Sequence, residues 1–128
     1  MASFNVFGMD EVLKAFAQEA ERMERNGPAA AQAGAEAAIA AMEKTVPVRT
    51  GGLKGHIAAK GPFHDSVDGH YCDVFPTGKN KQGERYETIG YVLEYGRSNM
   101  PARPWMRTAV ETGGDAIGEA MAEALMKD

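Results

Sequence analysis

Apolar residues in the first third of the chain recur every three or four positions, a spacing that places them on one face of an amphipathic helix. In the segment 10–26 this face consists of Leu13, Phe16, Ala20 and Met23. Asp10 precedes the first turn and can act as its N-cap. Asn26-Gly27 can end a helix and Pro28 can begin one. The pattern therefore predicts either a helix pair or one long helix that is kinked at this point.

The segment 28–46 continues the helical period and is rich in alanine. Its narrow apolar stripe consists of Ala31, Ala35, Ile39, Met42 and Val46. We expect this helix to end before Pro47, because the residue preceding a proline is pushed out of helical dihedrals. Alanine buries little area, so such a helix needs close neighbours to be stable, and oligomerisation is one way to supply them.

After Pro47 the period changes from helical to alternating. Residues 48–52 are typical of a turn, and residues 53–60 can extend as a first strand of weak pattern. A second strand is predicted over 70–75, followed by a polar loop at 77–84 that we interpret as a hairpin connection. A third strand is predicted over 85–95, with one face formed by Ile89, Tyr91, Leu93 and Tyr95.

A last helix is predicted from Pro104 onward, since proline is favoured at a first helical position. Its apolar positions are Trp105, Ala109, Ile117, Met121 and Leu125, with Gly113-Gly114 as a weak point. The sequence therefore predicts a single α+β domain over residues 1–128. We expect an N-terminal helix or helix pair, a small antiparallel sheet of three to four strands, and a C-terminal helix packed on the sheet.

Composition is that of an ordinary globular domain: 128 residues, 44% hydrophobic and 25% charged. The net charge of -4 argues against non-specific nucleic-acid binding as the main activity. No apolar run approaches the roughly 20 residues that cross a bilayer, and we expect no secretory signal at the N-terminus. Cys72 is the only cysteine, which excludes an internal disulfide and fits synthesis in a reducing cytoplasm.

Several potential metal ligands lie within and between the first two predicted strands: His56, His64, Asp65, Asp68, His70 and Cys72. His70 and Cys72 would point to the same face of a strand, and zinc accepts both ligand types. Their spacing matches no known zinc pattern, however. We therefore expect polar turn residues and one half-buried thiol, with no metal and no cofactor.

Catalytic residues are equally hard to place. Glu87 and Glu94 would lie on opposite faces of the third predicted strand, so they do not converge by local geometry. Cys72 has His70 nearby, but strand neighbours two residues apart rarely form a nucleophile–base hydrogen bond. The sequence predicts that the protein is not an enzyme.

Basic residues form two groups. Lys79, Lys81 and Arg85 surround the polar loop, whereas Arg97, Arg103 and Arg107 surround the junction that leads into the last helix. The junction also contains Tyr95, Met100 and Trp105. Arginine combined with aromatic residues is typical of interface anchors, although Trp105 itself is expected to be a core residue.

Glu94, at the end of the third predicted strand, could pair with Arg97, with Arg103, or with an arginine of a neighbouring subunit. The predicted interface therefore consists of Glu94, Arg97, Arg103, Arg107, Lys79, Lys81 and Arg85. An alternative is a nucleic-acid-binding or regulatory module that uses the basic residues around Arg97 and Arg103.

Three motifs resemble the HK-97-like phage gene product ten family. Residues 47–57, PVRTGGLKGHI, are similar to the family pattern P-x-x-T-G-x-L-(R/K)-x-x-I. Residues 91–96, YVLEYG, resemble its Y-(V/A)-x-x-(V/L)-E-(F/Y)-G segment, and residues 101–106, PARPWM, resemble its x-A-(R/Q)-P-(F/W)-(L/M) helix entry. The residues expected to define this fold are Thr50, Gly51, Leu53, Tyr91, Leu93, Gly96, Pro104 and Trp105. Residues 61–84 have no counterpart in the family pattern.

This resemblance implies a structural virion protein of a long-tailed phage or prophage that acts in head–tail joining, tail completion or tail termination. Related proteins form rings, commonly of six subunits, that contact neck or connector proteins and the tail tube. It further implies that DNA passes through the ring without specific binding, and that no membrane is involved. The expected location is the tail or neck of the virion, after synthesis in the cytoplasm of the bacterial host.

Overall fold

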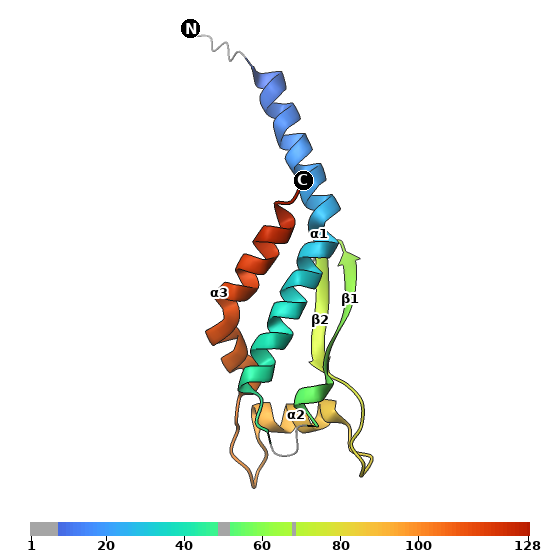
Figure 1. Ribbon diagram of the computed structural model, residues 1–128, viewed down its shortest axis with the longest axis vertical. Coiled ribbons are helices and arrows are strands. Elements are labelled where there is room, and N and C mark those ends of the chain that lie inside the picture. Colours follow the sequence, from blue (N-terminus) through green and yellow to red (C-terminus); the bar gives the residue numbers. More distant parts are fainter. Residues whose placement is uncertain (1–7, 49–51, 68) are drawn as a thin grey trace.

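The computed structural model describes residues 8–48, 52–67 and 69–128. In chain order these form α1 (Met9–Thr45), a short 3-10 helix (Lys54–His56), β1 (Ile57–Asp65), β2 (Gly69–Pro76), α2 (Tyr86–Tyr95) and α3 (Trp105–Leu125) (Figure 1). The α+β class is confirmed. Thr50 and Gly51, predicted to help define the fold, lie outside the described residues, as does Asp68.

α1 is one continuous helix of 37 residues, so the alternative of a single long helix holds and the helix pair does not. Pro28 lies inside it. Proline already has a helical φ, although inside a helix it removes one backbone hydrogen bond and crowds the carbonyl four residues earlier. The alanine-rich residues that follow have the highest helix propensity. The predicted break at Asn26-Gly27-Pro28 is therefore absent.

α3 packs antiparallel against α1. At one end the Thr45 hydroxyl donates to the carbonyl of Trp105 (2.7 Å), and at the other the Asn26 amide donates to the carbonyl of Leu125 (2.9 Å). The interface consists of small residues, so the backbones approach closely: a Cβ atom on Gly113 would lie 2.7 Å from the Cβ of Ala41. The predicted weak point at Gly113-Gly114 is thus a point of close helix contact.

β1 and β2 form an antiparallel hairpin, with Ile57 opposite Pro76 at one end and Asp65 opposite Gly69 at the other. The hairpin lies against one side of α1 and α3 against the other, so α1 lies between them (Figure 1). The expected sheet of three to four strands is wrong, because the described sheet has two. The first strand also begins later than predicted, after the 3-10 helix.

The predicted third strand over 85–95 is a helix, α2. Its buried residues are Tyr86, Gly90 and Glu94, four positions apart, which is the helical rather than the alternating period. Residues 77–84 consequently do not connect two strands. They join β2 to α2 as a loop in which Asn80 Oδ1 accepts from the backbone N–H groups of Gln82 (3.0 Å) and Glu84 (2.9 Å).

The core lies where α2 crosses the ends of α1, α3 and the hairpin, and consists of Met42, Val46, Leu53, Ile57, Tyr86, Trp105 and Ala109. Trp105 is 2% exposed, and its indole N–H donates to the carbonyl of Gly90 (3.1 Å). Its predicted place in the core is confirmed, although it anchors α3 to α2 rather than to the sheet. Leu53 is buried and Leu93 packs against the core. Among the described residues, no helix has both the length and the apolar character required to span a bilayer.

Candidate interaction surfaces

Glu94 is turned into the protein. Its side chain is 7% exposed and accepts hydrogen bonds from the backbone N–H groups of Met106 (2.7 Å) and Arg107 (3.2 Å). These are unpaired donors in the first turn of α3, where the helix dipole also favours a negative charge. Its predicted ion pair with Arg97 or Arg103 is not formed between these described residues. Glu94 therefore stabilises the start of α3 and does not offer its carboxylate to a partner.

The turn between α2 and α3 requires glycine at its start. Gly96 has a φ of 76°, and a Cβ atom there would lie 2.7 Å from the backbone nitrogen of Ala102. Arg97 and Met100 then exchange two backbone hydrogen bonds of 2.9 and 3.0 Å, and the N–H of Arg103 donates to the carbonyl of Leu93 (2.7 Å). Pro104 is the N-cap of α3 rather than its first residue. The backbone of this turn is fixed, while the Arg97 and Arg103 side chains remain exposed.

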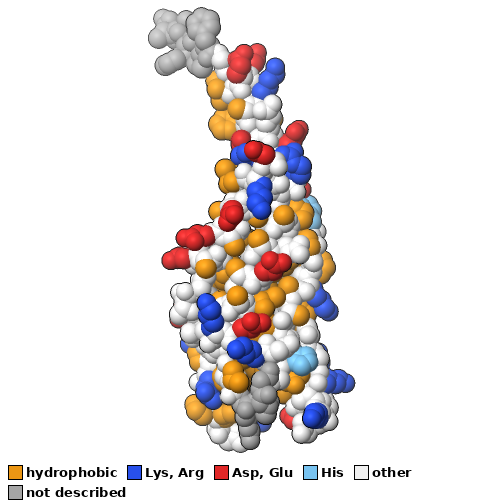
Figure 2. Space-filling view, in the orientation of Figure 1, with side chains coloured by type: hydrophobic (Ala, Val, Ile, Leu, Met, Phe, Trp, Pro, Cys, Tyr) orange, Lys and Arg blue, Asp and Glu red, His pale blue; other side chains and the backbone are white. Residues whose placement is uncertain are grey.

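All six basic residues of the predicted interface are exposed near the α2 end of the molecule: Lys79, Lys81, Arg85, Arg97, Arg103 and Arg107. Arg85 pairs with Glu87 (2.6 Å), and Arg107 lies 3.9 Å from Glu111. Figure 2 shows basic side chains gathered toward this end. The structure thus brings the two predicted basic groups into one region.

The opposite end is richer in acidic residues. In residues 9–25 of α1 the acidic residues are Asp10, Glu11, Glu19, Glu21 and Glu24. In the second half of α3 and after it they are Asp115, Glu119, Glu123 and Asp128. They outnumber the basic residues of the same region, which are Lys14, Arg22, Arg25 and Lys127. The charge of the molecule is therefore polarised along its long axis.

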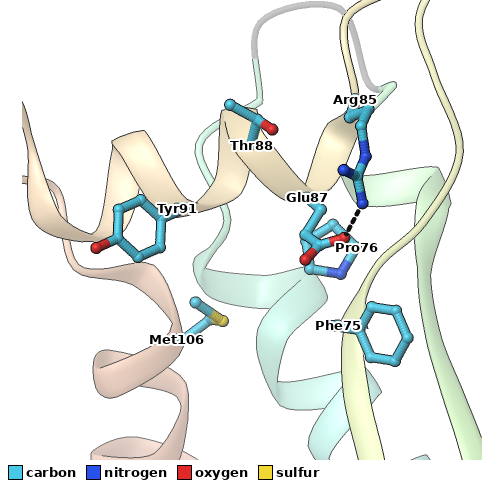
Figure 3. Close-up of a pocket in the computed structure, with 7 residues that line it drawn as sticks. All are labelled: Phe75, Pro76, Arg85, Glu87, Thr88, Tyr91 and Met106. Atoms are coloured by element: carbon cyan, nitrogen blue, oxygen red, sulfur yellow. Dashed lines mark hydrogen bonds and ion pairs between the residues drawn. The ribbon is translucent and has the colours of Figure 1, made fainter.

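The outer face of α2 carries an apolar surface that sequence reasoning missed. Tyr91, predicted to help define the fold, is 62% exposed, and its ring lies 4.8 Å from that of exposed Tyr95. Beside Tyr91 is a shallow hollow, lined by Phe75, Pro76, Arg85, Glu87, Thr88, Tyr91 and Met106 (Figure 3). In Figure 3 the Arg85–Glu87 ion pair lies at one side of the hollow and Tyr91 at the other. The helical period, had it been chosen for this segment, would have placed Tyr91 outside.

A second exposed apolar surface lies on α1. α3 ends beside Asn26, so the preceding turns of α1 extend beyond the rest of the protein (Figure 1). Their exposed apolar side chains, which we term the projecting stripe, are Met9, Val12, Leu13, Phe16 and Met23. Exposure ranges from 45% at Met23 to 69% at Phe16. The predicted shared face is present, and nothing in the described chain covers it (Figure 2).

The residues weighed for catalysis do not assemble into a reactive pair. Burial raises the pKa of the Cys72 thiol, and the negative charge of Asp73 raises it further. The thiol is therefore held in its protonated, weakly nucleophilic form. Because α2 is a helix, Glu87 and Glu94 lie on the same side rather than on opposite faces, yet Glu94 is engaged by backbone N–H groups. His56 stacks on Tyr86, whereas His64 and His70 both lie near Glu24.

Comparison of the chain with protein-family models, curated proteins and solved structures finds no match. The resemblance to the phage family therefore rests on the three motifs alone. In the structure, the second of these motifs forms the end of α2 with Glu94 and Gly96, and the third forms the entry into α3.

Proposed function

We propose that this protein is a structural assembly protein of a long-tailed phage or prophage, acting in head–tail joining or tail completion as a homo-oligomeric ring. The projecting stripe is the observation that carries this proposal. It is a continuous apolar face on a helix that leaves the body of the protein, and no residue within 8–48, 52–67 or 69–128 covers it. Contiguous apolar exposure of this kind marks an interaction surface.

The physical argument concerns what stabilises these turns. Residues 9–21 extend about 20 Å at 1.5 Å per residue. Most of the stability of a helix in a protein comes from packing of its apolar face, and the described part of the chain supplies no such packing for this segment. Complete burial of a side chain such as Leu13 or Phe16 contributes about 1.5–3 kcal/mol, so covering the stripe favours association.

A second copy of this chain is the partner that the charges favour. The turns that carry the stripe contain the acidic residues Asp10, Glu11 and Glu19, whereas basic residues such as Arg85 and Arg97 lie at the two ends of α2, which carries the exposed tyrosines. One copy can therefore place its stripe on the α2 face of the next, joining apolar to apolar and acidic to basic surface. Such a contact uses two different patches on each subunit, and repeated contacts close into a ring when the rotation permits.

The assignment to a phage neck or tail follows from the resemblance, which also supplies the ring of six subunits, the connector and tail-tube partners, and passage of DNA without specific binding. The geometry supports it in one respect. The junction motif forms a fixed turn that presents Arg97 and Arg103 outward. Arg103 and Arg107 are then interface residues, with Glu94 holding the start of the helix that carries Arg107.

Native mass spectrometry tests the proposal, on the purified chain alone and after mixing with tail tubes of the phage or prophage that encodes it. The wild-type chain is expected to form a closed oligomer or to join the tubes as one. The double variant Leu13→Glu/Phe16→Glu is expected to remain monomeric because it places two charges in the stripe. The matched control is Ala15→Glu/Gln18→Glu, which adds the same charge on the opposite face of the same turns and is expected to assemble.

Two outcomes contradict the proposal. One is a wild-type chain that stays monomeric and never joins tail tubes. The other is a Leu13→Glu/Phe16→Glu variant that assembles as well as the control, since the stripe would then not be the contact.

Nucleic-acid binding is the second candidate, favoured by the gathering of six exposed basic residues at one end. It predicts that affinity for duplex DNA falls steeply with salt and that Arg97→Ala/Arg103→Ala weakens binding, while Lys14→Ala does not. The assembly proposal instead expects no binding, or binding with weak salt dependence. Fluorescence anisotropy over a series of salt concentrations separates the two.

A further inference from the structure

Three potential metal ligands from three different elements meet beside α1. Glu24 comes from α1, His64 from β1 and His70 from β2, and their ligand atoms all lie within 4.8 Å of one another. Glu24 Oε1 lies 3.1 Å from His70 Nε2 and 3.8 Å from His64 Nε2, and the two imidazole rings are 4.4 Å apart between centroids. Local sequence spacing predicted no metal site, because it cannot anticipate a ligand 40 positions or more away.

The hairpin register places both histidines toward α1. His64 lies directly opposite His70, so their side chains share one face of the hairpin. An irregularity between Lys60 and Phe63 adds one residue to β1, and Gly61 adopts a φ of 115° within it. Without that extra residue the alternation would turn Phe63 toward α1 and His64 away. With the extra residue present, Phe63 pairs with Tyr71 on the other face, and their ring centroids are 5.5 Å apart.

α1 in turn makes room for the imidazole of His70. Gly27, three residues after Glu24 on the same side of the helix, is buried beneath this ring. A Cβ atom on Gly27 would lie 2.7 Å from His70 Cγ and 2.8 Å from Nε2, which is too close for any larger residue. Glycine inside a helix costs about 1 kcal/mol relative to alanine. Its presence here permits the close approach that brings His70 to Glu24.

We propose that Glu24, His64 and His70 form a binding site for a divalent transition metal ion, with Zn²⁺ as the expected occupant. Two imidazoles and one carboxylate are ligands that zinc accepts. Zinc–ligand bonds of about 2.0–2.2 Å in a tetrahedral site separate the ligand atoms by about 3.3–3.5 Å. Small side-chain rotations of the exposed Glu24 and His64 reach this spacing from the present one. The fourth position remains open to water or to a donor from another molecule.

A simple ion pair explains less of this arrangement. Glu24 and His70 alone would form an adequate hydrogen bond, and His64 would not be needed. Protonating both imidazoles places two like charges side by side next to a single carboxylate. A shared cation instead uses the lone pairs of two neutral imidazoles and the charge of the carboxylate.

A bound metal would fasten the turn end of the hairpin to α1 at the point where α1 leaves the body. On the other side of α1, Arg22 pairs with Asp128 (3.2 Å) and the Asn26 amide bonds to the end of α3. With the metal bound, α1 would be held from both sides at the point where its projecting turns begin. This role is independent of the proposed function, because it concerns the monomer.

The test uses the full chain without an affinity tag, stripped of metal by a chelator and titrated with Zn²⁺ by calorimetry. Saturable binding of one ion per chain is expected. Glu24→Gln and His64→Ala are each expected to weaken binding by about tenfold or more, since even loss of an outer-shell partner costs that much. Glu21→Gln is the matched control: it removes the same charge from the same helix outside the cluster and is expected to bind as the wild type does.

Imidazole nuclear magnetic resonance supplies the second readout. The chain has 3 histidines, and zinc is expected to shift the ring signals of His64 and His70 while leaving those of His56 in place. His70→Ala would also disturb packing on Gly27, so the Glu24 and His64 variants carry the test, with circular dichroism showing that they are folded. The proposal is overturned by the absence of saturable binding, by unchanged affinity in either of these variants, or by equal shifts at His56.

Discussion

The two halves of α1 have apolar residues on the same helix face but in different surroundings. From Gly27 onward this face has small residues such as Ala31 and Gly34 and is buried by α3 and the hairpin. Before Gly27 it is made of larger residues such as Leu13 and Phe16 and is exposed. One face of one helix therefore stabilises the fold along one half and is left uncovered along the other.

This difference separates two roles that hydrophobic periodicity alone does not distinguish. Small residues allow a neighbouring helix of the same chain to approach closely, as at Ala41 and Gly113. Larger apolar residues on a projecting helix instead offer area to a surface that lies outside the monomer. Substitutions in the covered half are expected to change stability, and those in the projecting half to change association.

The largest expected effect contrasts two methionines of α1. Met42 is buried in the core, whereas Met23 lies in the projecting stripe and is 45% exposed. Met42→Ala is expected to lower the free energy of unfolding by about 2–5 kcal/mol, because it leaves a cavity among packed neighbours. Met23→Ala is expected to change it by about 0.5 kcal/mol or less. Urea denaturation of dilute protein measures both, and equal losses would mean that the stripe is packed within the monomer.

The next effect repeats the contrast on α2, where Glu94 is buried and Glu87 is exposed. Glu94→Gln removes the charge from the N-terminus of α3 and exchanges an acceptor for an amide group that cannot accept from Arg107. We expect a loss of about 1–3 kcal/mol in unfolding free energy. Glu87→Gln, which only breaks a surface pair with Arg85, is expected to cost less than about 1 kcal/mol. If Glu94→Gln left the free energy of unfolding unchanged in the same denaturation assay, Glu94 would not stabilise the start of α3.

The smallest expected effect is on stability, which substitution by alanine is expected to lower at one glycine of α3 and to raise at the adjacent one. Gly113→Ala places a Cβ atom 2.7 Å from that of Ala41, so α1 and α3 must separate and stability is expected to fall. Gly114→Ala meets nothing within 4 Å and is expected to gain up to about 1 kcal/mol from helix propensity. Thermal unfolding followed by circular dichroism reports both shifts. A stabilising Gly113→Ala would show that the helix pair is looser than described.

The sequence predicted the helices better than the strands, for a physical reason. The apolar period of residues 9–45 and 105–125 is long enough to be unambiguous. Residues 86–95 are few and rich in aromatic and β-branched side chains, so both an alternating and a helical period fit them. Packing decides between the two, because Gly90 and Glu94 meet Trp105 and the start of α3. Those partners lie on other elements and leave no mark on local periodicity.

The candidate surfaces were predicted in part. The exposed positions of Arg97, Arg103 and Arg107 follow from their charge, and the core position of Trp105 from its size and its place in the last helix. Glu94 was predicted to be an interface residue. Its burial and its hydrogen bonds to backbone N–H groups depend on where α3 begins, which the local pattern of residues does not show. The meeting of Glu24 with His64 and His70 depends on hairpin register and on packing against α1, and spacing along the chain reports neither.

Hydrogen exchange at two protein concentrations tests the central claim most directly, that the projecting half of α1 is the contact between copies. In dilute, monomeric protein, amides of residues 9–23 are expected to exchange rapidly and those of residues 30–45 slowly. At high concentration, residues 9–23 are expected to become protected together with the α2 face around Tyr91 and Tyr95, while residues 30–45 stay as before. Exchange of residues 9–23 that remains rapid in an assembled oligomer would contradict the account.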